Sequence, residues 1–237
     1  MDSFRAYEYL ESEILTGRLK PRERLVEQEI AEQLKMSRTP IREALRRLEE
    51  RGLVRILPHR GAVVSDISPA EVEHIYVVRN VLEVLAVRLA IDRITPEQIE
   101  RVHVLEAAHA GEASGGDVRG LMRVNDQFHD AIYGATGNSC LLETIQQLRR
   151  QIHPVRFNAW ARPERIARSV VEHRLMVEAL NRRDKDGLAL LTEEHLRVSK
   201  ESYLLHLGAV PAPTMGCESW GALAGSIAGK STERGRE

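Results

Sequence analysis

Apolar residues recur at helical spacing along most of the chain, and polar stretches rich in Gly and Pro separate the helical segments. The first 66 residues predict three short helices, at 4–16, 26–36 and 37–52. In the third helix the apolar positions recur at i, i+3, i+4 and i+7, which makes one buried stripe. Two short β-type runs then flank a turn at Pro58–Gly61 and predict a hairpin. Three helices followed by a hairpin describe a winged helix-turn-helix.

From residue 68 onward the pattern predicts long helices only. "SPAE" (68–71) and "TPEQ" (95–98) have the form of capping boxes with proline at the first helical position, and they open helices that run to about Ile94 and His109. "GEASGGD" (111–117) predicts a flexible loop. Four more helices are expected near 118–135, 139–160, 163–182 and 186–207. The predicted fold is therefore mainly all-α, a winged helix-turn-helix followed by an antiparallel helical bundle.

These patterns divide the chain into a winged domain (1–67), an all-helical domain (68–207) and a small, polar, Gly-rich tail (208–237) that we expect to be disordered. With 43% hydrophobic and 29% charged residues, the chain can form a packed core. Cys140 and Cys217 are far apart and form neither a disulfide framework nor a metal motif, which fits the reducing cytoplasm. No signal peptide is visible, and no apolar run approaches the ~18 residues of a membrane span.

Positive charge is concentrated in one segment, although the whole chain has a net charge of −1. Residues 35–60 hold eight basic residues against three acidic ones. Arg38, Arg42 and Arg46 repeat every four residues of the third helix, so they form one exposed row. Arginine is the residue type that binds guanine O6 and N7 bidentately in the major groove. Such a row can also be an ordinary solvated helix face.

The residues around the arginine row favour DNA binding over a solvated face. Ser37 and Thr39 stand at the helix start, where hydroxyl and backbone N–H groups can donate to phosphates. At the tip of the wing, His59, Arg60 and Gly61 combine cations with a flexible glycine, which suits a minor groove or a phosphate. A short preceding helix, this helix start and a basic hairpin together predict a double-stranded DNA partner.

The segment "GRLKPRERLVEQEIAEQLKMSRTPIREALRRLEERGLVRILPHRGAVV" (17–64) resembles the winged-helix domain of the GntR family of bacterial transcription regulators. The resemblance implies that Arg38 and Arg42 are the operator-contacting arginines. It implies phosphate or base contacts for the residues at the helix start and at the wing tip. Two departures are Arg22, where the family commonly has Gly, and Met36, in a position usually held by Val. Neither changes the assignment.

Three histidines and one asparagine of the second domain could hold a metal ion. Asn125 and His129 are i, i+4 on one predicted helix, so both side chains can reach one site. His173 and His195 lie within two other predicted helices. Three imidazoles and one oxygen ligand suit Zn or another borderline divalent ion. The chain holds six other histidines, so ordinary buried or solvated histidines are the alternative interpretation.

Residues 70–207 resemble the all-helical FCD effector domain of the FadR-like GntR subgroup. The resemblance implies the ligand set Asn125, His129, His173 and His195, with zinc, or nickel or manganese, as the ion. Many relatives carry Asp at the position of Asn125, and a neutral amide compensates the charge of the ion less. Asp126 could compete for the ion, but it lies about 100° further round the helix.

In such domains the metal and nearby arginines serve a small organic acid, and a bound cation does attract a carboxylate. The resemblance implies that Arg79 lines the effector cavity. The alternative is a simple intrahelical ion pair between Arg79 and Glu83. Arg149, Arg150 and Arg156 are further candidates for the cavity, for which we favour the alternative that they are surface charges.

The sequence therefore predicts a cytoplasmic, homodimeric, ligand-responsive repressor without catalytic activity, which binds a pseudo-palindromic operator. One alternative is a regulator for which the metal itself is the signal. Another is a metal-dependent hydrolase fused to a DNA-binding domain, since three histidines on zinc also describe a catalytic site. Against the hydrolase, no general base is clearly placed, because Glu172 and Glu194 each adjoin a proposed ligand and are expected to point elsewhere.

Overall fold

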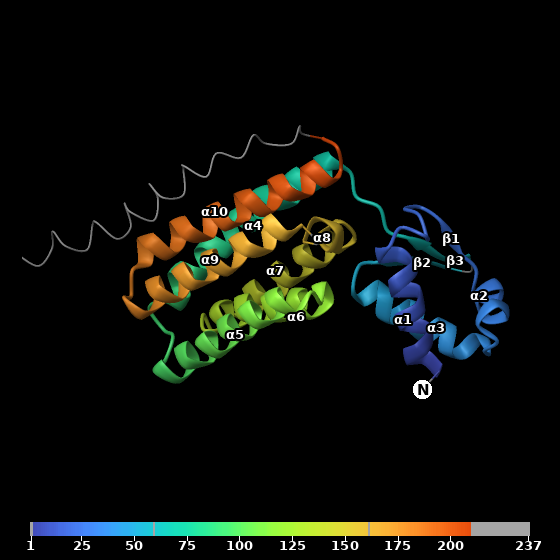
Figure 1. Ribbon diagram of the computed structural model, residues 1–237, viewed down its shortest axis with the longest axis horizontal. Coiled ribbons are helices and arrows are strands. Elements are labelled where there is room, and N and C mark those ends of the chain that lie inside the picture. Colours follow the sequence, from blue (N-terminus) through green and yellow to red (C-terminus); the bar gives the residue numbers. More distant parts are fainter. Residues whose placement is uncertain (1, 59, 161, 210–237) are drawn as a thin grey trace, which may run out of the picture.

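The N-terminal part consists of three helices and a three-stranded antiparallel sheet (Figure 1). The structure, a computed structural model, describes residues 2–58, 60–160 and 162–209. The elements are α1 (Asp2–Leu15), β1 (Arg24–Leu25), α2 (Glu27–Leu34), α3 (Arg38–Glu50), β2 (Val54–Leu57) and β3 (Gly61–Val64). The strand order is β1-β3-β2, with Arg55 opposite Val63. This is the winged helix-turn-helix that the sequence predicts, with one strand added, since β1 is too short to show an alternating pattern.

The winged part has its own hydrophobic core. Tyr7 and Leu10 of α1 and Ile41 and Leu48 of α3 belong to one buried cluster, all of whose members lie between Ala6 and Val64. The predicted apolar stripe of α3 is the face that enters this core. The opposite face of α3 is therefore free to carry charge.

The second part is a bundle of long helices, which makes the fold mainly all-α as predicted (Figure 1). Its elements are α4 (Pro69–Ala90), α5 (Pro96–Gly115), α6 (Val118–Gly134), α7 (Ser139–Gln151), α8 (His153–Trp160), α9 (Pro163–Asn181) and α10 (Lys185–His206). Both predicted capping boxes form. The Ser68 N–H donates to Glu71 at 2.8 Å, and the Thr95 N–H donates to Gln98 at 3.0 Å.

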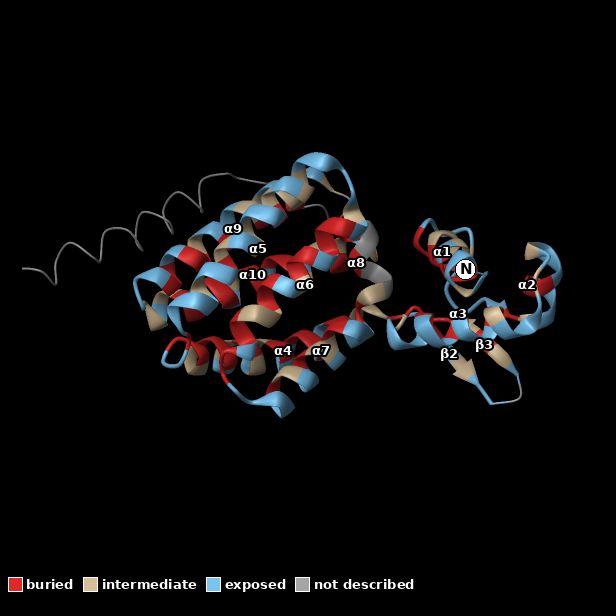
Figure 2. Ribbon diagram, turned by 90° about the horizontal axis from the view of Figure 1, so that it is seen from below, coloured by how far each residue is buried: buried red, intermediate tan, exposed pale blue. Residues whose placement is uncertain are grey.

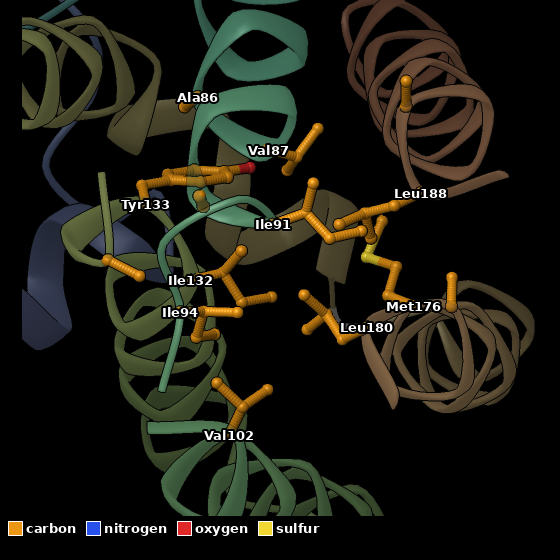
Figure 3. Close-up of a cluster of buried hydrophobic side chains, with 14 of the residues drawn as sticks. Ala86, Val87, Ile91, Ile94, Val102, Ile132, Tyr133, Met176, Leu180 and Leu188 are labelled. Atoms are coloured by element: carbon orange, nitrogen blue, oxygen red, sulfur yellow. The ribbon is translucent and has the colours of Figure 1, made fainter. Parts of the chain in front are cut away.

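Two clusters of buried side chains form the interior of the bundle. Figure 3 shows one of them, in which Ile91, Ile132, Leu180 and Leu188 from four segments converge. The other contains Tyr76, Trp160 and residues of α10. Figure 2 shows the buried residues on the inward sides of the bundle helices and the exposed residues on the outward sides. Each part of the chain thus has a core of its own.

Two predictions of secondary structure are wrong in the bundle, one of a loop and one of a helix. The predicted loop 111–117 is mostly helix, because α5 continues to Gly115 and ends at Gly116 in the left-handed region. Ala113 packs against the second buried cluster, and this tertiary contact overrides the weak helix propensity of Gly and Ser. The predicted single helix 139–160 is divided into α7 and α8 at Ile152. Pro154 follows directly and has no N–H to continue the helix from α7.

The two parts meet where the ends of α3 and α7 touch. Gly52, directly after α3, has φ +74° and closes the helix with a Schellman motif, in which the Leu53 N–H donates to the Leu48 carbonyl at 2.9 Å. A Cβ at Gly52 would lie 2.3 Å from the carbonyl oxygen of Arg150. Beside this contact a cavity of about 630 Å³ separates the two parts. The residue that ends α3 therefore lies against the backbone of α7 in the bundle.

The chain ends lie partly outside the described residues. Residues 210–237, which make up most of the expected tail, are outside them, as is His59 of the wing. Within the described residues, no helix is both long and apolar enough to cross a membrane.

Candidate DNA-binding surface and metal centre

The arginine row of α3 is exposed, as its spacing predicts. Arg38, Arg42 and Arg46 all lie on the solvent side of the helix. Ser37 occupies the N-cap position, but its side chain makes no capping hydrogen bond, so its hydroxyl is available to a ligand. Thr39 is exposed beside it. The face thus presents hydroxyl and guanidinium donors together.

Glu27 of α2 holds two of these arginines in place, a contact that the sequence pattern does not reveal. Its carboxylate accepts from Arg42 Nη2 at 2.7 Å and Nε at 3.0 Å, and from Arg38 Nη2 at 3.4 Å. The hydrogen bond from Arg42 lowers the pKa of Glu27. Arg42 is half-exposed, so this pair orients the guanidinium more than it stabilises the fold.

The wing, which is the hairpin of β2 and β3, and helix α3 enclose a basic groove. A cavity of about 520 Å³ lies between them, lined by Arg42 and Arg46 of α3 and by Arg60 of the wing, among others. Gly61 is more than a flexible tip, since a Cβ there would lie 2.5 Å from the carbonyl oxygen of Leu25 in β1. The glycine allows β1 and β3 to approach closely and fixes the base of the wing.

In the bundle, the structure brings His129, His173 and His195 together. They come from α6, α9 and α10, and all three are buried. Their ring centres are 5.0–5.3 Å apart, and one ring nitrogen of each lies within 4.8 Å of the others. Burial lowers the pKa of each ring and so favours the neutral form, which is the form that binds a metal ion.

Asn125 lies one turn before His129 and is 4% exposed. Its side-chain oxygen is buried and has no hydrogen-bond partner among the described residues, which fits a ligand atom. The competing Asp126 points to Arg156 instead, which donates to it at 2.8 and 3.1 Å. The available donor set is therefore three imidazoles and one amide oxygen, which suits zinc.

Two of the three histidines are oriented by acidic partners. His195 Nδ1 lies 2.6 Å from Glu172, so the expectation that Glu172 points away from the site is wrong. Burial alone would raise the pKa of Glu172, but Arg165 and His195 lower it to about 2. Arg165 and Arg168 contact this carboxylate at 3.1 and 3.0 Å.

The second acidic partner acts through a tyrosine. His129 Nδ1 lies 3.3 Å from the Tyr133 hydroxyl, which donates to Glu83 at 2.7 Å. Arg79 is buried and donates to the same carboxylate at 2.7 Å, and its guanidinium stacks on Tyr76. The intrahelical pair of Arg79 and Glu83 therefore exists, and it is tied to the histidine cluster.

Arg149 and Arg156 are buried, so their interpretation as surface charges is wrong, whereas Arg150 is exposed. Arg149 pairs with Asp130 and lies over the ring of Tyr133. Its Nε and Nη1 are buried and have no hydrogen-bond partner among the described residues. Burial could not be predicted from spacing, because the acidic partner comes from another helix.

Comparison with known proteins identifies both parts. Residues 3–64 match the model of bacterial regulatory proteins of the gntR family, and residues 74–198 match the FCD domain. The Nta operon transcriptional regulator of Aminobacter aminovorans is 32% identical over 180 residues, which cover 75% of this chain and 83% of that protein. The HTH-type transcriptional repressor RspR of Escherichia coli is 27% identical over 199 residues, 83% of this chain and 86% of that protein.

A solved structure has the same arrangement. The structure of McbR/YncC from Escherichia coli superposes with a TM-score of 0.68 at 27% sequence identity, covering 86% of this chain and 98% of that one. The similarity therefore extends over both parts of the chain.

Proposed function

Because the chain belongs to the GntR family of bacterial regulatory proteins and carries an FCD domain, a combination found in transcription regulators and not in enzymes, we propose a specific mode of action. The protein binds a pseudo-palindromic operator as a homodimer, in the cytoplasm. A small organic acid held beside a divalent metal ion changes that binding. One relative is named a repressor, which supports repression as its effect.

The observation that carries the DNA-binding proposal is the basic groove between α3 and the wing. Glu27 aligns two exposed guanidinium groups there, and Arg60 stands across the groove. A major groove admits one helix, and oriented arginines can bind guanine edges bidentately. Ser37 and Thr39 at the helix start are placed for phosphate contacts.

Arg42→Ala tests this proposal. We expect operator affinity to fall about 5- to 150-fold for each half-site, because one bidentate contact is lost, while binding to random duplex falls much less. The measurement is fluorescence anisotropy on DNA from upstream of the gene, across a salt series. Arg101→Ala, on the exposed side of α5, makes the same charge change away from the groove and should leave affinity unchanged. Equal operator affinity of wild type and Arg42→Ala would exclude the row as the base-contacting element.

The metal proposal rests on the donor set. His129, His173 and His195 would bind the ion through ring nitrogens, and Asn125 through its side-chain oxygen. Three neutral imidazoles favour zinc, with nickel as a competitor and manganese less suited. A bound ion supplies a positive charge that attracts a carboxylate. The alternative, in which the metal itself is the signal, predicts that DNA affinity follows metal concentration without any acid.

The acid proposal rests on buried arginines near this centre. Arg149 Nε and Nη1 are buried and lack a hydrogen-bond partner among the described residues, Nη1 lying 3.6 Å from an oxygen of Asp126, so a carboxylate could accept from both. Arg79 is already paired with Glu83, so its role would be to orient that carboxylate and the attached tyrosine. A screen of hydroxy acids, sugar acids and dicarboxylates would identify the class of acid.

The homodimer proposal rests on an exposed apolar stripe of α4. Val77, Val81 and Leu85 follow one another at i, i+4 and i+8, and they are 68%, 64% and 45% exposed. A second copy of this helix would cover the stripe and set the distance between two winged parts. Val81→Glu should therefore give a monomer by sedimentation velocity and weaken operator binding. Val171→Glu alters an exposed valine of α9 and should remain dimeric. If Val81→Glu stays dimeric, the interface lies elsewhere.

A further inference from the structure

A fourth histidine lies against the candidate metal centre. His109, near the end of α5, is 0% exposed. Its ring centre is 4.3 Å from that of His173, and its ring meets Trp160 edge-on at 6.0 Å. Both of its ring nitrogens are buried without a hydrogen-bond partner among the described residues. A buried polar group in this condition destabilises the fold, so it needs a compensating role.

The three histidines among the four proposed ligands differ in their outer contacts. His195 has Glu172 at 2.6 Å, and His129 has the Tyr133 hydroxyl at 3.3 Å. His173 has no hydrogen-bond partner for either ring nitrogen among the described residues. A histidine that binds a metal ion almost always donates its other N–H to an acceptor, which fixes the ring orientation. Besides the other two proposed histidine ligands, His109 lies against the ring of His173, with the two ring centres 4.3 Å apart.

We propose that His109 accepts a hydrogen bond from the ring nitrogen of His173 that faces away from the metal, and so positions His173 for metal binding. This inference rests on the proposed metal centre. It makes His109 a positioning residue for that centre. It also explains a buried imidazole that the DNA-binding and effector-binding roles do not use.

The surroundings of His109 suit an acceptor. A neutral imidazole carries one N–H and one bare nitrogen, so it can accept one hydrogen bond, and His109 is fully buried with both ring nitrogens without a hydrogen-bond partner among the described residues. Rotation of two rings whose centres are 4.3 Å apart can bring one nitrogen of each within hydrogen-bond distance, since the ring torsion of His is broad. Phe128 stacks on the face of the His173 ring at 4.2 Å, and both ring nitrogens of His173 lack a hydrogen-bond partner among the described residues.

The geometry favours an outer contact of His109 over direct ligation. The described side chains whose ligand atoms all lie within 4.8 Å of one another are His129, His173 and His195, and His109 does not join that set. Its described ring contacts are with His173 and Trp160. We therefore assign it an outer contact.

A matched pair of variants tests the role. His109→Met removes both nitrogens, and His109→Gln has a similar shape but keeps an amide oxygen that can accept. The affinity of the full chain for Zn²⁺ and Co²⁺ is measured by competition with a chromophoric chelator, and the visible spectrum of bound Co²⁺ reports its ligand geometry. His74→Gln, on the exposed side of α4, is the control.

We expect His109→Met to weaken metal affinity about 10- to 100-fold, His109→Gln to recover most of it, and His74→Gln to match wild type. The Co²⁺ spectrum should keep its form in every variant. Without metal, the melting temperature of His109→Met should be no lower than that of metal-free wild type, because the substitution removes a buried polar group that has no hydrogen-bond partner. If Met fails to fold, His109→Leu repeats the test.

The possible failures are distinguishable. No metal binding by wild type would overturn the metal centre itself. Wild-type affinity in the Met variant would overturn the role of His109 while the centre stands. An altered Co²⁺ spectrum without recovery by Gln would make His109 a direct ligand and would also overturn the proposal.

Discussion

The contact between the two parts of the chain can be tested at Gly52. Alanine at φ +74° costs about 1–2 kcal/mol. A Cβ at Gly52 also lies 2.3 Å from the Arg150 carbonyl oxygen, where ordinary contact begins at 3.4 Å, so α3 and α7 must separate by about 1 Å. Such overpacking costs about 1–3 kcal/mol. We expect Gly52→Ala to destabilise the protein by about 2–5 kcal/mol in total.

Gly17→Ala separates the cost of backbone strain from the cost of the steric clash. Gly17 has φ +73°, and a Cβ there meets nothing within 4 Å, so this variant carries the backbone strain without the clash. Gly52→Asn does the reverse, because Asn tolerates the left-handed region but keeps the Cβ. In scanning calorimetry the melting temperature should fall at least about 2 °C further for Gly52→Ala than for Gly17→Ala. Hydrogen exchange at the end of α7 should rise in the two Gly52 variants alone. Equal behaviour of Gly52→Ala and Gly17→Ala would refute the contact.

Two further predictions concern buried acids. Glu83→Gln leaves the buried Arg79 without its carboxylate and should cost about 3–5 kcal/mol near pH 7. Burial raises the pKa of Glu83, but Arg79 and other groups outweigh burial and hold this pKa below its usual 4.5. The wild type should therefore be more stable than the variant above pH 4.5. This advantage should shrink as the pH falls further, which melting curves across pH can check. Glu172→Gln should weaken Zn²⁺ binding about 10- to 100-fold in chelator competition, since His195 loses its anionic partner; unchanged affinity would exclude that role.

The sequence predicts most of the fold because the relevant signals are local. Capping boxes at Ser68 and Thr95, the apolar stripe of α3 and the glycine after it each involve a few neighbouring residues, and the structure contains all of them. The loop predicted at 111–117 failed because packing of Ala113, a contact between distant segments, decides that region.

The candidate site shows the same division. The arginine row and the ligand histidines follow from helical spacing and family resemblance. Their supporting contacts do not, because each joins separate helices: Glu27 to Arg42, and Glu172 to His195. Spacing along one helix could suggest that Glu172 points away from His173, but not that it meets a ring from α10. The burial of His109 likewise depends on how α5 packs against α9.

We propose that an acid bound in the bundle controls how the winged parts bind DNA. The most direct test is an anisotropy titration of the zinc-loaded protein on duplex from upstream of its gene, with hydroxy acids, sugar acids and dicarboxylates added in turn. We predict that one class of acid shifts the apparent Kd at least about fivefold, and that chelation of the metal abolishes the shift. Tight, specific DNA binding that no acid and no chelator changes would contradict the account.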